Sequence, residues 1–248
     1  MACFVRPDYE VLTHWVSSYL KLAVESAQSL GLQVFDLYGS QATAESFFNV
    51  LSQFNPYIVC SSTHGLENVV YGQDGTPLLT GCVNDQALSG KVYFALACRT
   101  ASALGPSSIS KGGLIYWGWL EDFIVIMDES YPPLQDPYAY SFLHPILDGL
   151  DVLFRSILAG VDVQTLARNV YEAVVKSFND EIAYWRTAPT ATASQMLTYL
   201  IHDRDTFVPI TAAGIYTPPA MVTAQFPLQA FLAVGAATLP LALKGLMK

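Results

Sequence analysis

The chain of 248 residues is long enough for one large domain that buries a two-sided sheet, and we expect a single hydrophobic core. Hydrophobic residues make up 52% of the chain and charged residues only 13%, against the roughly 25% charged that is usual in soluble domains. The net charge is −9 and the few Lys and Arg residues are scattered singly, so no basic stripe can neutralise a phosphate backbone and nucleic acid is excluded as a partner.

The four cysteines show neither a CxxC pair nor the dense spacing of a disulfide framework or a zinc site; they are Cys3, Cys60, Cys82 and Cys98. We therefore expect reduced thiols, a cytoplasmic location and no metal or other cofactor. The N-terminal sequence MACFVRPDYE has no basic segment followed by an apolar run, so no secretory signal is expected.

The N-terminal part of the chain predicts a helix, a strand and a second helix. Apolar residues recur at three- and four-residue spacing over residues 8–30, which is typical of an amphipathic helix, and Gly31 then ends it. The segment QVFDL (33–37) predicts a short strand. Residues 43–54 form a second helical pattern, which Asn55-Pro56 closes.

Three nearly continuous apolar runs follow, as expected of strands buried on both faces: YIVCSS (57–62), KVYFALA (91–97) and GGLIYWGW (112–119). Between the first two, the Asp74-Gly75 step favours a hairpin. Because such strands alternate with helices, we predict a three-layer α/β/α sandwich with a mostly parallel central sheet.

The second half of the chain is predicted to be mainly helical. Helical patterns cover residues 141–159, 162–185 and 193–203, and Asp162 is placed to cap the second of them. We assign residues 1–205 to one folded domain.

Residues 206–248 form a hydrophobic C-terminal extension, in which no charged residue occurs from Thr206 to Leu243. Its stretch 226–243 is close to the minimum length for crossing a bilayer, although Pro227 and Pro240 interrupt it. Membrane contact, packing on the protein's own core, and packing against another subunit of a homo-oligomer or larger assembly all remain open.

His64 and Cys98 each follow a predicted buried strand. The carboxyl ends of parallel strands lie along one edge of a sheet, so the two side chains face each other if their strands are neighbours. An imidazole beside a thiol raises the population of thiolate and can later protonate a leaving amine. Gly65 allows a substrate carbonyl to approach the backbone closely, and its N–H together with that of Cys98 would form an oxyanion hole.

These segments resemble the cysteine peptidases of clan CD, which include caspases, gingipains and the CHAT-domain group, and the gingipain and CHAT members most of all. The resemblance rests on SSTHG at one strand end, YFALACRTA at the next, the Gly-rich GGLIYWGW after it, and the helical FLHPILDGLDVLFRSILAGVDVQTLARNVYEAV. It covers about residues 30–205. Arg99 and Ala101 differ from the acidic residue and glycine that the CHAT group often has there, which leaves the substrate preference open.

The resemblance implies a caspase-like topology and a cysteine endopeptidase acting on protein or peptide substrates through a thioester. Cys98 would be the nucleophile, His64 the general base and acid, and Gly65 an oxyanion donor. The alternative is an inactive module of the same fold, which would serve binding or assembly through its apolar C-terminal extension.

Four further residues are candidates for a substrate pocket: Asp36, Trp117, Trp119 and Glu121. Asp36 ends a predicted strand and could orient His64 or receive a basic side chain, or it could be an ordinary solvated or capping carboxylate. The two tryptophans could wall a subsite, although packing in the core is the commoner fate of such residues.

Overall fold

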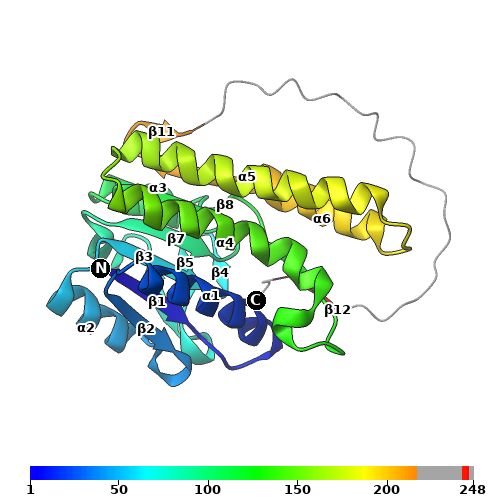
Figure 1. The fold of residues 1–248 in the computed structure, drawn as a ribbon. Coiled ribbons are helices and arrows are strands. Elements are labelled where there is room, and N and C mark those ends of the chain that lie inside the picture. Colours follow the sequence, from blue (N-terminus) through cyan, green and yellow to red (C-terminus); the bar gives the residue numbers. More distant parts are fainter. Residues whose placement is uncertain (217–241, 246–248) are drawn as a thin grey trace.

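The computed structural model describes residues 1–216 and 242–245 and has a three-layer α/β/α architecture (Figure 1). The order of strands in the central sheet is β11 (Gly214–Ile215), β10 (Phe207–Thr211), β8 (Ile115–Trp119), β7 (Val92–Leu96), β3 (Ile58–Ser62), β1 (Ala2–Arg6) and β2 (Val34–Tyr38). The pairs from β8 to β2 are parallel, and β10 runs antiparallel to both β8 and β11. The predicted three-layer sandwich with a mostly parallel sheet is confirmed.

Six helices flank this sheet in the described part of the chain: α1 (Val11–Ser29), α2 (Ala44–Phe54), α3 (Leu104–Ser110), α4 (Pro137–Leu158), α5 (Val163–Thr187) and α6 (Ala193–Thr206). One face of the sheet packs in a single core with α1, α4, α5 and α6, and the other face packs with α2 and α3. The apolar residues of β3 and β7 alternate between these two cores, which explains why their apolar runs are nearly continuous.

The sequence signals for the ends of the helices correspond to observed caps. Asp162 accepts hydrogen bonds from the backbone N–H groups of Gln164 (2.9 Å) and Thr165 (3.0 Å) at the start of α5, as predicted. After α2, Asn55 has the left-handed φ of +46° that commonly ends a helix.

Two small sheets lie outside the central one. The first joins β4 (Gly65–Leu66), β5 (Val69–Tyr71) and β6 (Pro77–Thr80), and Asp74 and Gly75 have φ of +57° and +68° in the predicted hairpin turn between the last two strands. The second pairs β9 (Ile124–Met127) with β12 (Ala242–Gly245).

The C-terminal region differs from the expectation at its start. We assigned residues from 206 onward to an extension, but β10 pairs with β8 and is part of the central sheet. Most of the uncharged stretch 226–243 lies outside the described residues. Among the helices that are described, none has the length and apolarity needed to cross a membrane.

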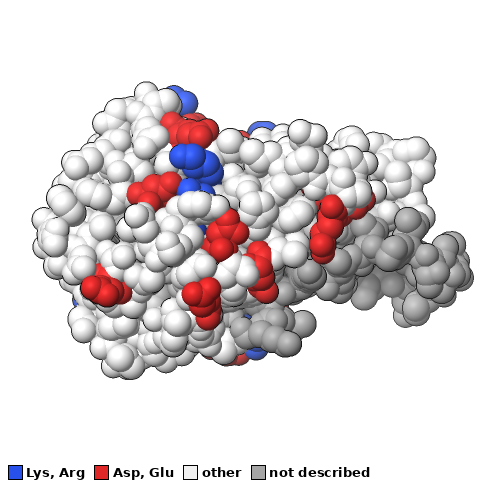
Figure 2. All heavy atoms as spheres, turned by 90° about the horizontal axis from the view of Figure 1, so that it is seen from below, with Lys and Arg blue, Asp and Glu red and all other residues white. Residues whose placement is uncertain are grey.

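The surface of the described residues carries scattered charge. On the face that Figure 2 shows, acidic side chains are spread widely, and the few basic ones lie among them without forming a basic patch.

An ion pair between Arg6 of β1 and Asp36 of β2 joins the two strands at one side of the central sheet. The Arg6 guanidinium donates to both carboxylate oxygens of Asp36, each at 2.7 Å, and also to the Ser17 carbonyl of α1 at 2.9 Å. The Arg6 side chain is only 5% exposed, so its charge depends on Asp36 for compensation.

Replacing Asp36 with Asn should therefore destabilise the fold by about 3 to 5 kcal/mol, because it leaves a buried guanidinium without a counter-charge. Urea denaturation of the two proteins measures this difference. Asp180→Asn, which removes the partner of the exposed Lys176, is the matched control and should leave the midpoint unchanged. Equal midpoints for Asp36→Asn and the control would contradict a structural role for the Arg6 pair.

Candidate active site

The strands that carry the two predicted catalytic residues are parallel neighbours. Ser62 of β3 pairs with Leu96 of β7, and one residue further on the Thr63 N–H donates to the Leu96 carbonyl at 3.0 Å. His64 and Cys98 each lie two residues beyond that pair. They therefore leave the sheet at the same level, and the alternation of strand residues directs both toward the face that α1 and α4 cover.

The backbones after these two strands are in direct contact. A methyl group built on Gly65 would lie 2.9 Å from the Cys98 carbonyl oxygen and 2.7 Å from a side-chain carbon of Thr100. Real side chains do not approach that closely, so Gly65 is needed here for the His64 and Cys98 segments to meet. This close approach places the predicted oxyanion residues next to each other; the orientation of their N–H groups stays a prediction.

His64 is held by a residue that the sequence did not reveal. Its Nε2 atom contacts the carboxylate of Glu10, the residue that precedes α1, and its Nδ1 atom is buried without a hydrogen-bond partner. The ring also lies beside Tyr9, with 6.3 Å between the ring centroids. A carboxylate on one nitrogen fixes the imidazole and leaves the other nitrogen as the one that could accept a proton.

Glu10 escaped prediction because it is 54 positions from His64 in the chain. It follows β1, and β1 is the sheet neighbour of β3, so its loop reaches the same edge of the sheet. Recognition of β1 as a strand would have placed Glu10 near His64.

Cys98 lies beneath the surface in a closed arrangement. It is fully buried, and its Sγ atom donates to the Phe123 carbonyl at 3.7 Å rather than to His64. Burial raises the pKa of the Cys98 thiol far above its ordinary value, and the negative charge of Asp122 raises it further. The thiol is therefore protonated and unreactive in this conformation.

Residues 121–124, which provide the Phe123 carbonyl bound to the thiol and the Asp122 charge near it, form a segment that we call the clasp. Arg99 binds it twice, through its backbone N–H to the Glu121 carbonyl (3.0 Å) and through an ion pair of its Nε with the Asp122 carboxylate (2.8 Å). From α6, His202 Nε2 donates to the Asp122 carbonyl at 2.9 Å. The Ile124 N–H donates to the buried Asp203 carboxyl at 3.0 Å. Every residue of the clasp except Phe123 is thus bound by Arg99 or by α6, and Phe123 accepts from Cys98 itself.

Two of the predicted pocket residues belong to the core instead. Trp117 and Trp119 are fully buried, and their indole N–H groups donate to the carbonyls of Ala167 (3.3 Å) and Asp203 (2.9 Å). Neither ring is placed to line a subsite, because both belong to the hydrophobic core between the sheet and its helices.

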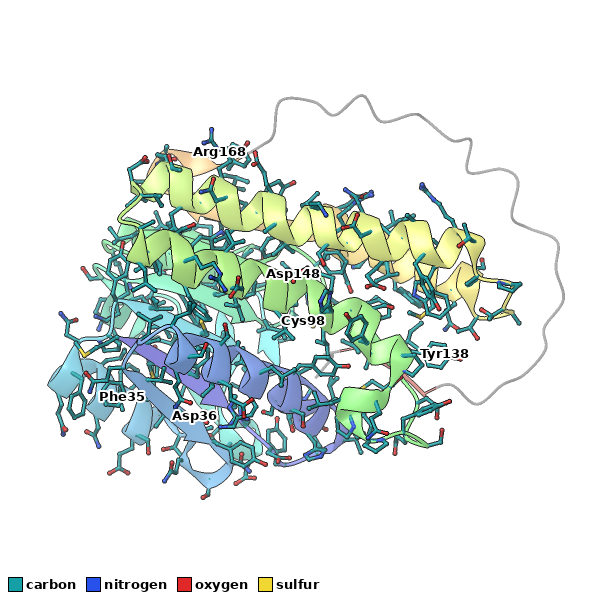
Figure 3. All side chains as sticks on the ribbon, in the orientation of Figure 1. Phe35, Asp36, Cys98, Tyr138, Asp148 and Arg168 are labelled. Carbon is teal, nitrogen blue, oxygen red and sulfur yellow. The ribbon has the colours of Figure 1, made fainter. Side chains whose placement is uncertain are left out.

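Asp36 is also not part of a substrate pocket, since its carboxylate forms an ion pair with Arg6. It lies on β2, three strands from β7, a separation of about 14 Å at the usual strand spacing, and Figure 3 shows it well apart from Cys98. It does not orient His64, whose Nε2 contacts Glu10 and whose Nδ1 has no hydrogen-bond partner. Glu121 is exposed next to the site, and its pocket role stays a prediction.

The described residues contain no group of three or more His, Cys, Asp and Glu side chains arranged to hold a metal ion. The groups that the described residues bring to this site are Cys98, His64, Glu10 and the nearby backbone.

Of the comparisons with known proteins, the comparison with solved structures gives a match, and those with family models and curated sequences do not. Among solved structures, gingipain R, an arginine-specific cysteine proteinase, is similar with a TM-score of 0.41 and 12% identity over 73% of this chain. The matched part spans 42% of the gingipain chain.

Replacing Asp122 with Asn should make Cys98 more reactive, because it removes the charge beside the thiol and one of the bonds that hold the clasp. Each unit by which the thiol pKa falls increases the thiolate fraction about tenfold. The rate of Cys98 alkylation by iodoacetamide, followed by mass spectrometry, measures the change. In the native chain this rate should stay far below that of the exposed Cys82 at neutral pH, since burial holds the pKa of the Cys98 thiol well above that range.

Glu67→Gln is the matched control, since Glu67 also pairs with Arg99 (2.9 Å) but is 53% exposed and does not contribute to the raised pKa of Cys98. If both variants alkylate at the native rate, Asp122 does not control the thiol.

Proposed function

We propose that the chain is a cysteine endopeptidase in which Cys98 is the nucleophile and His64 the general base and acid. The observation that carries this proposal is the close approach of the two strand ends, with His64 and Cys98 on one face and Gly65 against the Cys98 carbonyl. Glu10 is a positioning residue, which holds Nε2 of the imidazole so that Nδ1 can serve the thiol.

The closed arrangement must open before chemistry. When Cys98 leaves the Phe123 carbonyl, His64 can accept the thiol proton, and the thiolate then attacks the carbonyl carbon of the substrate. Backbone N–H groups of Gly65 and Cys98 would stabilise the oxyanion. As the C–N bond breaks, His64 returns the proton to the leaving amine, and a thioester remains. Water then attacks the thioester, which releases the acid and restores the thiol.

A peptide-library cleavage assay that compares the native chain with Cys98→Ala tests this proposal. We expect cleavage by the native chain, faster cleavage by Asp122→Asn, and none by Cys98→Ala. Cleavage that survives Cys98→Ala would contradict the mechanism. Absence of cleavage by both the native chain and Asp122→Asn would reject the peptidase.

The role of Glu10 can be tested separately. Glu10→Gln should lower kcat by about 10²- to 10⁴-fold with little change in KM, because the imidazole loses its orienting charge while substrate contacts remain. Glu25→Gln, on the exposed side of α1, is the control and should leave kcat unchanged. A Glu10→Gln enzyme with native kcat would remove Glu10 from the site.

A second function, binding or assembly without catalysis, is favoured by one observation: the Cys98 thiol is buried and protonated. In an inactive module of this architecture, Cys98 would be a buried apolar residue and the protein would act in binding or assembly. Such a module should keep its stability and its partners in Cys98→Ser and His64→Ala variants. An active enzyme would lose all cleavage in both.

A further inference from the structure

The C-terminal strand β12 pairs with β9 along the whole length of β9. The antiparallel register runs from Ala242 opposite Met127 to Gly245 opposite Ile124. These two strands form a sheet of their own, separate from the central sheet. The last described residues of the chain are thus bound to an element from its middle.

The ladder reaches the clasp that covers Cys98. Ile124, opposite Gly245, is both the first residue of β9 and the last residue of the clasp. The residue before it, Phe123, provides the carbonyl that accepts from the Cys98 thiol. A displacement of β9 would therefore move the group that seals the thiol.

We propose that β12 is an intramolecular strap, whose pairing with β9 keeps the clasp closed over Cys98 and whose release exposes the thiol. The proposal gives a regulatory mechanism to the site described above, and only its consequence for catalysis rests on the proposed function. The sealing of the thiol can be measured without any substrate.

The strap can open without unfolding the protein. A two-stranded ladder of four residues is weak by itself, and no strand of the central sheet pairs with β9 or β12 among the described residues. After release, β9 keeps its contacts with α4 and α6 but has an unpaired edge. The clasp then keeps its bonds to Arg99 and α6 and the packing of Phe123 on Trp119, but the strand that continues it has lost its partner, so the clasp should open more often.

The test compares the full chain with a chain that ends at residue 241. Without β12, alkylation of Cys98 by iodoacetamide should become at least tenfold faster, and the amides of β9 should exchange with deuterium faster. Cys82 is exposed and lies outside this region, so its alkylation is the internal reference. A synthetic peptide with the sequence of residues 240–248, added to the shortened chain, should slow both processes again.

Two point variants keep the proposal testable if the shortened chain does not fold. In an antiparallel ladder, adjacent residues direct their N–H groups to opposite sides, so only one of Leu243 and Lys244 donates to β9. Proline removes that donor. One of Leu243→Pro and Lys244→Pro should therefore release Cys98, and the other should behave as the native chain.

Cys98 alkylation at the native rate in a folded shortened chain, or in both proline variants, would overturn the proposal. Unchanged exchange of the β9 amides would overturn it as well. Faster alkylation without any peptide cleavage would support the strap and reject the peptidase, so the two proposals fail separately.

Discussion

The parallel pairing of β3 with β7 is the constraint on which the candidate site depends. It carries two residues that are 34 positions apart to the same level of the sheet and the same face. The pairing is useful for chemistry only because Gly65 lets the backbones after the strands touch. The apolar residues of both strands are buried in the cores on either side, so the position of the site is fixed by the packed core of the molecule.

Two different environments meet at this edge of the sheet. On the His64 side, the carboxylate of Glu10 contacts Nε2 and fixes the position of the imidazole, while Nδ1 has no hydrogen-bond partner. On the Cys98 side, burial and the charge of Asp122 favour the neutral thiol. The arrangement combines a positioned imidazole with a protonated thiol. In the proposed peptidase, opening of the clasp would change only the environment of the thiol.

The parts of the fold that the sequence predicted are those with local signals. Continuous apolar runs indicated β3, β7 and β8, periodic spacing indicated the long helices, and Asp162 and Asp74-Gly75 marked a cap and a turn. These features depend on residues close together in the chain. The positions of His64 and Cys98 followed from the strand ends, and the neighbouring placement of their strands is confirmed.

The missed features depend on contacts between distant segments. β1 is five residues long and ends in Arg6, whose burial is possible only because Asp36 of β2 lies beside it. Glu10 was missed together with β1. β10 was assigned to the C-terminal extension because its residues are uncharged. A strand buried in the central sheet and an apolar tail have the same composition, so the sequence does not distinguish them. Trp117 and Trp119 were placed correctly on a strand, but the strand pattern could not reveal that both side chains enter the core.

The central claim, that His64 serves Cys98, is tested most directly by the alkylation rate of Cys98 relative to Cys82 in the native chain and in His64→Ala. If the imidazole takes the proton from the thiol whenever the clasp opens, loss of His64 should lower this ratio at least tenfold at neutral pH while Cys82 reacts as before. The same ratio in both proteins would show that Cys98 ionises without His64, and would contradict the pairing of the two residues.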